Sequence, residues 1–394
     1  MSTSDISISG RAAIAGLGAT EFSKNSGRTE LRLAMEATLA ALADAGIDPK
    51  EVDGFCSYTM DKVPDYEIAR LLGATDVKFF SQIPHGGGAA CAPVMHAAMA
   101  VASGVARTVV VYRAMNERSW YRFGSGSYGF GSAPVFDNVN YGWYMPSGFH
   151  TPAAWVAMFA RRYMHRWGAT SEDFGRVAVA ARDFAATNPA AFFHGKPITL
   201  EDHQKSRWIA EPLHLLDCCQ ESDGAVAMVI TSAERARDLR QPLVLVKGAA
   251  QGISEGQQSM TSFYRDDITG LPEMGLVARQ LWQQSGLRPA DVQTAVIYDH
   301  FTPFVLPQLE EFGFCPRGEA KDFVRAGHHA RGGLLPVNTH GGQLGEAYIH
   351  GMNGVAEAVR QVRGSATNQV ADVRNVLVTA GTGVPTSGLI LGKE

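Results

Sequence analysis

Cysteine has the most reactive side chain in this sequence, and there are five: Cys56, Cys91, Cys218, Cys219 and Cys315. A cysteine thiolate serves either as a nucleophile or as a zinc ligand. Here the number is odd, and no two cysteines form a Cys-x-x-Cys pair. This pattern disfavours a disulfide framework or a zinc cluster within the chain. We therefore expect small, buried, apolar cysteines and no metal site.

Two sequence echoes connect the halves of the chain. The first is a Gly-x-x-Pro-x-x-Val pattern, in which Gly46, Pro49 and Val52 recur at Gly286, Pro289 and Val292. The second pairs His85-Gly86-Gly87 with His340-Gly341-Gly342, and each copy is expected to start a helix that leads to an apolar strand. Two matches in the same order indicate a duplicated unit. We expect domains at residues 1–240 and 241–394.

The segments around these turns alternate between strand and helix patterns, which is typical of α/β proteins. Short apolar runs predict strands at residues 11–18, 52–59, 107–113, 242–252 and 375–381, the first of which ends in glycine. Residues 29–45 predict a helix with Gly46 as its C-cap. The spacing of Leu31, Met35, Leu39 and Leu42 predicts one buried stripe on that helix.

The segment from Trp120 to Phe149 contains ten aromatic residues among glycine, serine and asparagine, whereas the whole chain is 9% aromatic. It has no helix or strand period, and we treat residues 116–150 as an insertion in the first half. Long irregular segments in compact domains are usually functional or mediate assembly. Two interpretations remain open: packing at a dimer interface and a wall of a large apolar substrate pocket.

Composition excludes several classes of protein. The 394 residues are 45% hydrophobic and 19% charged, with a net charge of −4. This balance is typical of a globular protein and offers no basic surface for nucleic acid or anionic membranes. The N-terminus lacks a signal-peptide pattern, and no run of 18 apolar residues occurs. We expect a cytoplasmic protein with no nucleic-acid or membrane partner.

Three long segments resemble the thiolase superfamily. They are EPLHLLDCCQESDGAVAMVITSAERA at residues 211–236, AVIYDHFTPFVLPQLEEFGFC at 295–315, and VNTHGGQLGEAYIHGMNGVAEAVRQVRG at 337–364. The last is similar to the Asn-x-x-Gly-Gly active-site loop of thiolases. The resemblance spans essentially the whole chain. It implies an α/β thiolase fold, with two duplicated halves in a five-layered αβαβα arrangement.

The four catalytic positions of thiolases all differ in this sequence. The nucleophilic cysteine is replaced by Gly87. The histidine ten residues after Asn338 is replaced by Tyr348. The cysteine of the C-terminal Cys-x-Gly-x-Gly turn is replaced by Thr379, and the asparagine or histidine of the oxyanion loop by Tyr298. Two tyrosines at two catalytic positions predict an acid–base pair in one pocket.

A phenol has an ordinary pKa near 10, so proton transfer near neutral pH requires help from its surroundings. We expect nearby positive charge or hydrogen-bond donors to lower the phenol pKa. The candidates close to the tyrosines in sequence are His300, His340 and His350. Each of these histidines also has a purely structural interpretation, as a residue satisfied by backbone groups.

This pattern resembles the thiolase-like aldolases of bacterial steroid side-chain degradation. The resemblance implies cleavage of a β-hydroxyacyl-CoA with a tertiary ring hydroxyl into a ring ketone and a short acyl-CoA, typically propionyl-CoA. Tyr298 and Tyr348 would be the catalytic base and acid, in unassigned order. Substrate would be bound by His300, His340 and backbone amides at Gly87 and Gly381. No cofactor is implied. The implied assembly is a homodimer with a small OB-fold and zinc-ribbon partner.

Two alternatives remain open from the sequence. An acyltransferase of the thiolase type would use Cys91, one helical turn after Gly87, as a displaced nucleophile. A lipid or sterol carrier with a degenerate site would account for the aromatic segment and the missing cysteine. The carrier does not account for two tyrosines at two catalytic positions.

Overall fold

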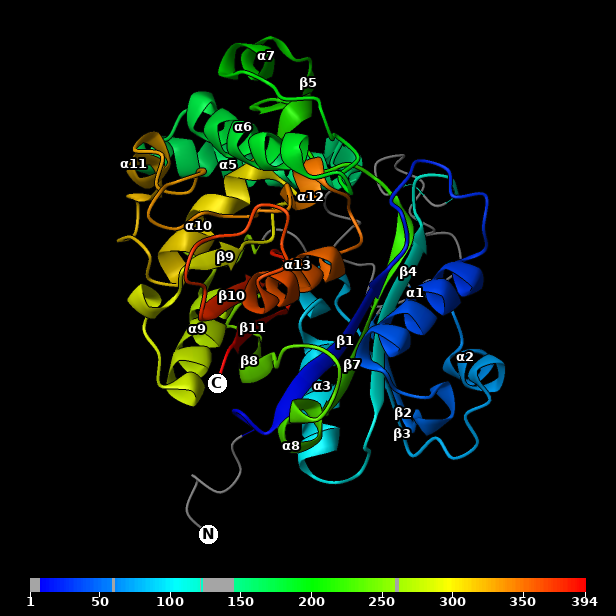
Figure 1. Ribbon diagram of the computed structural model, residues 1–394. Coiled ribbons are helices and arrows are strands. Elements are labelled where there is room, and N and C mark those ends of the chain that lie inside the picture. The colour runs from blue at the N-terminus through cyan, green and yellow to red at the C-terminus, as the bar shows by residue number, and fades with distance from the viewer. Residues whose placement is uncertain (1–7, 59–60, 121, 123–144, 259–261) are drawn as a thin grey trace.

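The protein is described by a computed structural model at residues 8–58, 61–120, 122, 145–258 and 262–394. Within these residues, nine strands form one mixed sheet in the order β3-β2-β4-β7-β1-β8-β11-β10-β9, and β5 pairs with β6 in a small second sheet (Figure 1). The strands are β1 (Ala12–Ala19), β2 (Gly54–Tyr58), β3 (Phe79–Ile83), β4 (Val109–Asn116), β5 (Trp208–Ala210), β6 (Leu213–His214), β7 (Asp223–Ser232), β8 (Leu245–Gly252), β9 (Thr294–Val296), β10 (Asn375–Thr379) and β11 (Thr386–Gly392).

The large sheet consists of two half-sheets that follow one plan. The order β2-β4-β7-β1 recurs as β9-β10-β11-β8, and the halves meet through the pair Ala13–Leu245. The inner strands β1 and β8 each pair antiparallel with the last strand of their half, β7 and β11. The predicted α/β class and the duplication are therefore confirmed. The domain boundary near residue 240 stays a prediction.

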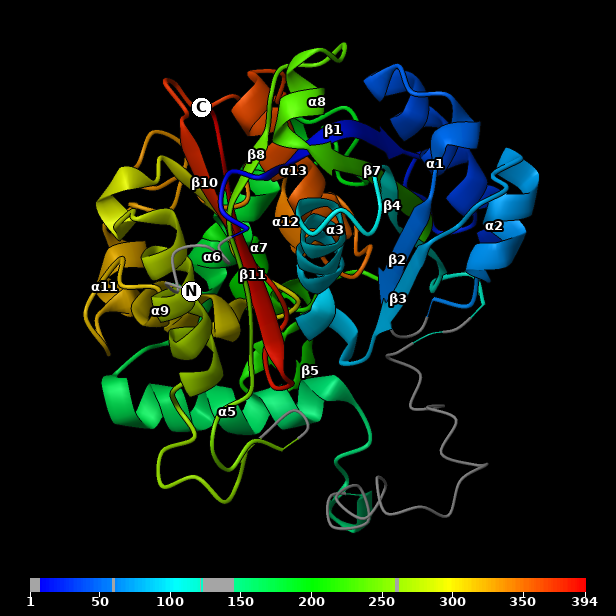
Figure 2. The ribbon, with the colours of Figure 1, turned by 90° about the horizontal axis from the view of Figure 1, so that it is seen from below.

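The helices form the other layers of the fold. They are α1 (Glu30–Ala45), α2 (Asp65–Leu72), α3 (Ala92–Ala102), α5 (Pro152–Trp167), α6 (Ser171–Thr187), α7 (Leu200–Lys205), α8 (Ala233–Arg237), α9 (Pro272–Ser285), α10 (Val305–Glu311), α11 (Ala320–Arg325), α12 (Gly342–Gly345) and α13 (Met352–Arg363). Figure 2 shows α3 between β11 on one side and β2 and β4 on the other.

Side chains alternate across each strand, and this alternation separates the layers. On β4, Val109 and Val111 pack with α3 and α13 in one apolar cluster, whereas Val110 and Tyr112 pack with α1 in another. On β10 and β11, Leu377 and Ile390 pack outward with α9. The predicted order of layers, helix, sheet, helix, sheet, helix, is confirmed.

Helix α1 buries different residues from those predicted. Thr29 caps its start, and Gly46 ends it at φ 73°, as expected. However, Leu39 is 45% exposed, and the buried face is Leu33, Ala34, Ala37, Thr38, Ala41, Leu42 and Ala45. The reason lies in β1: a Cβ on Gly16 would lie 2.1 Å from the Ala41 carbonyl oxygen. The helix packs so closely on β1 that mostly small residues fit there.

The two sequence echoes have different outcomes. The Gly-x-x-Pro-x-x-Val pattern forms the same structure twice, a 3-10 turn at Pro49–Glu51 and at Pro289–Asp291. The pairing of the His-Gly-Gly turns was wrong. His85 precedes α3, but Gly342 starts only the four-residue α12, and α13 begins after His350-Gly351. His350-Gly351 is therefore the structural counterpart of His85-Gly86.

The halves differ most in one connection. Residues 117–222 join β4 to β7 and carry α5, α6, α7, β5 and β6, whereas residues 380–385 join β10 to β11. Of the ten aromatic residues predicted to form a functional segment, Trp120 and Phe149 lie among the described residues and the other eight lie outside them. Within the described residues, every helix is too short or too polar to cross a membrane.

Candidate active site

Tyr298 and Tyr348 meet in the interior. Their hydroxyl oxygens are 3.2 Å apart, and the two rings are nearly perpendicular with centroids separated by 6.5 Å. Tyr298 follows β9, and Tyr348 lies between α12 and α13. Both are buried, and Met115 of β4 packs with them. The structure thus brings together the two residues that the sequence predicted as a pair.

Backbone contacts fix the position of Tyr298. Its amide donates to the Thr379 hydroxyl at 2.9 Å, and its carbonyl accepts from the Gln308 amide at 2.8 Å. The Thr379 hydroxyl donates in turn to the Gln308 side-chain oxygen at 2.6 Å. Thr379, at the position where thiolases carry a cysteine, therefore has a structural role. It joins β10 to the loop that carries Tyr298.

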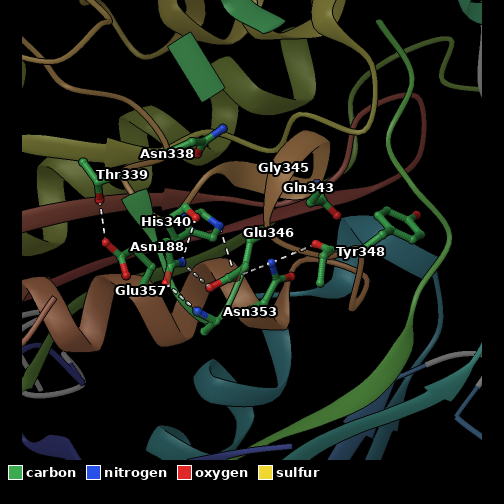
Figure 3. Close-up of polar contacts among 12 residues, drawn as sticks. Asn188, Asn338, Thr339, His340, Gln343, Gly345, Glu346, Tyr348, Asn353 and Glu357 are labelled. Atoms are coloured by element: carbon green, nitrogen blue, oxygen red, sulfur yellow. Dashed lines mark hydrogen bonds and ion pairs between the residues drawn. The ribbon is translucent and has the colours of Figure 1, made fainter. Parts of the chain in front are cut away.

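A buried polar network supports the loop that carries Tyr348 (Figure 3). The Tyr348 amide donates to the Ser222 hydroxyl at 3.1 Å. Two residues earlier, the Glu346 carboxylate accepts from Asn188 at 3.2 Å and from Asn353 at 3.0 Å. Burial raises the pKa of Glu346 to about 7. This loop therefore rests on a carboxyl group that is partly protonated at neutral pH.

Gly87 packs against the hydroxyl of Tyr298. A Cβ built on Gly87 would be 2.0 Å from the Tyr298 hydroxyl, well inside van der Waals contact. The hydroxyl of Tyr298 therefore fills the space that a side chain at residue 87 would need. The position where thiolases carry their nucleophile has no room for one in this protein.

The two predicted oxyanion amides lie side by side. The Gly381 amide donates to the Gly87 carbonyl at 2.8 Å, and a Cβ on Gly381 would be 2.7 Å from the Gly87 carbonyl carbon. To bind a substrate oxygen, the Gly381 amide would have to share its proton between that oxygen and the Gly87 carbonyl. The oxyanion role of both amides stays a prediction.

The two predicted substrate-binding histidines are in different places. His300 contacts Tyr298 edge-on at 5.1 Å and stacks on Phe304. His340 lies 3.9 Å from Glu346, on the support network. Burial lowers the pKa of each to about 3, so both are neutral. The structure brings His300 to the tyrosine pair and places His340 behind it.

The expectation of a lowered phenol pKa was wrong. Burial raises the pKa of Tyr298 and of Tyr348 well above the ordinary value, with the hydrogen bond between the two hydroxyls lowering that of Tyr298 only in part. Neighbouring histidines supply no positive charge, because burial also lowers the pKa of His300 and His350. Both phenols are therefore protonated at neutral pH, which favours concerted proton transfer over a standing phenolate.

Sequence reasoning missed the contribution of β4. Arg113, Met115 and the following Glu117 lie on the strand face that points between the half-sheets, and all three are buried. Met115 packs against the tyrosines, and burial raises the pKa of the Glu117 carboxyl, which acts on both tyrosines electrostatically. The available signal was a pair of charged residues, Arg113 within an apolar strand and Glu117 just after it, spaced so that both lie on the same face.

Cys91 has the surroundings of a core residue. It is fully buried, and its sulfur lies 3.8 Å from the Val378 carbonyl oxygen. Burial raises the pKa of its thiol, whereas nucleophilic cysteines have a lowered pKa. These surroundings weigh against the displaced nucleophile that an acyltransferase would need.

Comparison with known proteins agrees with this geometry. The family described as "Thiolase C-terminal domain-like" matches residues 254–393. The chain is 65% identical to a steroid side-chain-cleaving aldolase of Thermomonospora curvata, over 98% of this chain and 99% of that one. It is 66% identical to a 17-hydroxy-3-oxo-4-pregnene-20-carboxyl-CoA lyase of Mycobacterium tuberculosis, over 98% of this chain and 100% of the relative.

The chain is also similar to a solved Ltp2-ChsH2(DUF35) aldolase, with a TM-score of 0.94 and 64% identity over 98% of both chains. The fold and the altered site define a protein of the thiolase superfamily that lacks the thiolase nucleophile. Within it, the chain belongs to the thiolase-like aldolases that cleave steroid side chains.

Proposed function

We propose that the protein is a carbon–carbon lyase that cleaves the side chain of a 17-hydroxysteroid carrying a C20 carboxyl-CoA thioester. The observation that carries this proposal is the tyrosine pair, with hydroxyls 3.2 Å apart, at a site where residue 87 has no room for a nucleophile. In the substrate named for the Mycobacterium tuberculosis relative, the 17-hydroxyl is β to the thioester carbonyl. That arrangement is the one that retro-aldol cleavage requires.

The reaction is balanced without a cofactor or a covalent intermediate. The hydroxyl proton leaves, the O–H bond electrons form the second C–O bond of the 17-ketone, and the C17–C20 bond electrons pass into a thioester enolate. A proton then adds to C20, which gives propionyl-CoA. Because both phenols are protonated, we infer a relay in which one tyrosine receives the hydroxyl proton as it passes its own proton to the other, and the second tyrosine delivers its original proton to C20. Neither phenol then carries a full negative charge.

We also propose that the chain works as a homodimer with a small partner chain of the zinc-ribbon and OB-fold kind. The name of the solved relative joins two proteins, Ltp2 and ChsH2(DUF35). Strand β3 is at the edge of the sheet, and Phe80 on it is 72% exposed. Such an edge favours pairing with a second copy. Light scattering should give a dimer, and Phe80→Glu should shift it towards monomer.

Product analysis tests the proposed function. The protein, co-expressed with its partner, would be incubated with the steroid CoA thioester in the absence of free CoA. We expect equal amounts of a 17-ketosteroid and propionyl-CoA by mass spectrometry. A requirement for free CoA would indicate the acyltransferase instead. Binding of the thioester with no product would indicate the carrier.

A further inference from the structure

A fully buried arginine, Arg113, contacts His350, whose ring lies 5.5 Å from that of Tyr348. The Arg113 guanidinium donates to the Tyr58 carbonyl at 2.9 Å and to Nδ1 of His350 at 2.8 Å. It also lies over the Tyr58 ring and 4.0 Å from the Asp61 carboxylate. Burying a guanidinium costs several kcal/mol, which a core of apolar residues would avoid. This cost points to a function for His350, the residue that Arg113 holds.

Arg113 fixes the proton of His350. A guanidinium only donates hydrogen bonds, so Nδ1 of His350 must be the acceptor, and the ring proton lies on Nε2. Burial and the neighbouring Arg113 charge keep the pKa of His350 well below its ordinary value. The ring is thus a neutral imidazole in one tautomer.

The backbone also holds His350 in an unusual conformation. Its φ is 54°, in the left-handed region that few residues other than glycine adopt. The Tyr58 hydroxyl donates to its carbonyl at 2.8 Å. Residues held in such conformations cluster at functional sites, where the surrounding structure determines them. Backbone and side chain of His350 are therefore both fixed before a substrate binds.

The Cδ2–Nε2 edge of the ring faces Gly86 and Gly87. Nε2 lies 3.5 Å from a Cβ built on Gly86, and Cδ2 lies 3.2 Å from one built on Gly87. The Tyr298 hydroxyl approaches the same point on Gly87. The ring of Tyr348 is 5.5 Å from that of His350. The imidazole and both phenols therefore converge on one small region.

The retro-aldol step needs a donor for the developing enolate oxygen. In the relay, both tyrosine hydroxyls transfer protons. The Gly381 amide already donates a hydrogen bond to the Gly87 carbonyl. We propose that Nε2–H of His350 donates to the thioester oxygen as the C17–C20 bond breaks, and that Arg113 is the positioning residue that keeps this proton on Nε2. This inference rests on the proposed function and adds the group that stabilises its enolate. A fixed donor needs no reorganisation as charge develops.

Exchange of the C2 protons of propionyl-CoA for solvent deuterium measures enolate formation without cleavage. His350→Asn is the informative variant, because its side-chain oxygen replaces Nδ1 as acceptor for Arg113, asparagine tolerates positive φ, and Nε2–H is lost. We expect both exchange and steroid cleavage to fall about 10²–10³-fold, as for loss of one oxyanion donor. The loss should be in kcat rather than KM. His350→Gln, which restores a donor, should recover part of it.

His85→Asn is the matched control, since His85 has a φ of 89° at the equivalent turn before α3. It should exchange and cleave like the wild type. Exchange by His350→Asn within threefold of the wild type would overturn the inference and leave the proposed function intact. A wild type that neither exchanges nor cleaves would overturn both.

Infrared spectroscopy of [1-¹³C]propionyl-CoA bound to the wild-type protein tests for a donor at the thioester oxygen directly. The carbonyl stretch should move to lower frequency in the wild-type complex, and the shift should largely disappear in His350→Asn. An unshifted carbonyl in the wild type would contradict a donor at the thioester oxygen.

Discussion

The two buried helices α3 and α13 begin alike but in different surroundings. Each follows a histidine and a glycine in the left-handed region, His85-Gly86 before α3 and His350-Gly351 before α13. His85 is exposed and lines a cleft of about 310 Å³, whereas His350 is buried against Arg113. The segment from Gly86 through α3 contains no acidic residue, whereas Glu346 and Glu357 are buried around α13.

This difference shows that the two halves of the duplicated fold supply different parts of the site. In both halves the backbone brings a turn to the centre of the molecule, but the two tyrosines and His350 all come from the second half. The first half supplies Gly87, which has no side chain, and the supporting strand β4.

Removing the hydroxyls should have the largest effect. Phenylalanine preserves packing, so Tyr298→Phe and Tyr348→Phe should each lower kcat about 10²–10⁴-fold, the usual contribution of a general acid or base. Because the hydroxyls lie 3.2 Å apart in one relay, the double variant should lose less than the product of the single losses. Steady-state kinetics, with melting temperatures as control, would measure this. Near-wild-type turnover in both single variants would leave the carrier hypothesis ahead.

Adding a side chain at residue 87 should have the next largest effect. In Gly87→Ala the new methyl group would collide with the Tyr298 hydroxyl, which must move by about 1 Å or more. Such a displacement costs on the order of 10²-fold in rate. Gly248→Ala is the control, since its nearest neighbour is 3.3 Å away. If Gly87→Ala kept its turnover, the close packing of Gly87 and Tyr298 would have no catalytic importance.

The buried carboxylates around α13 should affect stability rather than rate. Burial raises the pKa of Glu346 from 4.5 to about 7, so between these pH values the folded protein binds more protons than the unfolded chain. The free energy of unfolding should therefore fall as pH rises through this window. Glu346→Gln cannot ionise and should flatten the decline by roughly 1–3 kcal/mol.

Urea unfolding at several pH values would measure this decline. In Glu346→Gln, Asn353 can turn its amide to accept from the new side chain, because its oxygen has no hydrogen-bond partner among the described residues. Glu201→Gln, at an exposed ion pair with Lys205, is the control and should keep the wild-type slope. Equal slopes in all three proteins would contradict a raised Glu346 pKa in the folded state.

The smallest effect on turnover should come from Cys91. Cys91→Ala removes a buried sulfur that lies against the Val378 carbonyl, so it should cost about 1 kcal/mol of stability and leave kcat within threefold. Iodoacetamide should likewise fail to inactivate the enzyme through this residue. Complete loss of turnover in a folded Cys91→Ala protein would favour the acyltransferase mechanism.

The sequence predicted the fold class and the duplication, because strand alternation and motif spacing are local signals. It predicted the meeting of Tyr298 with Tyr348 through their alignment with two catalytic positions of thiolases. The predictions from sequence failed where close packing determines the structure. The buried face of α1 depends on Gly16 of β1, and the counterpart of His85 proved to be His350 rather than His340. The raised phenol pKa values depend on burial, which spacing alone does not reveal.

The contact between Gly87 and Tyr298 also constrains the historical route between two chemistries. A cysteine at residue 87 and a tyrosine at residue 298 would compete for the same space. An ancestral enzyme with the thiolase nucleophile therefore had to lose that side chain before, or together with, the gain of this phenol. The same holds in reverse for protein engineering: restoring the cysteine alone would damage one active site without creating the other.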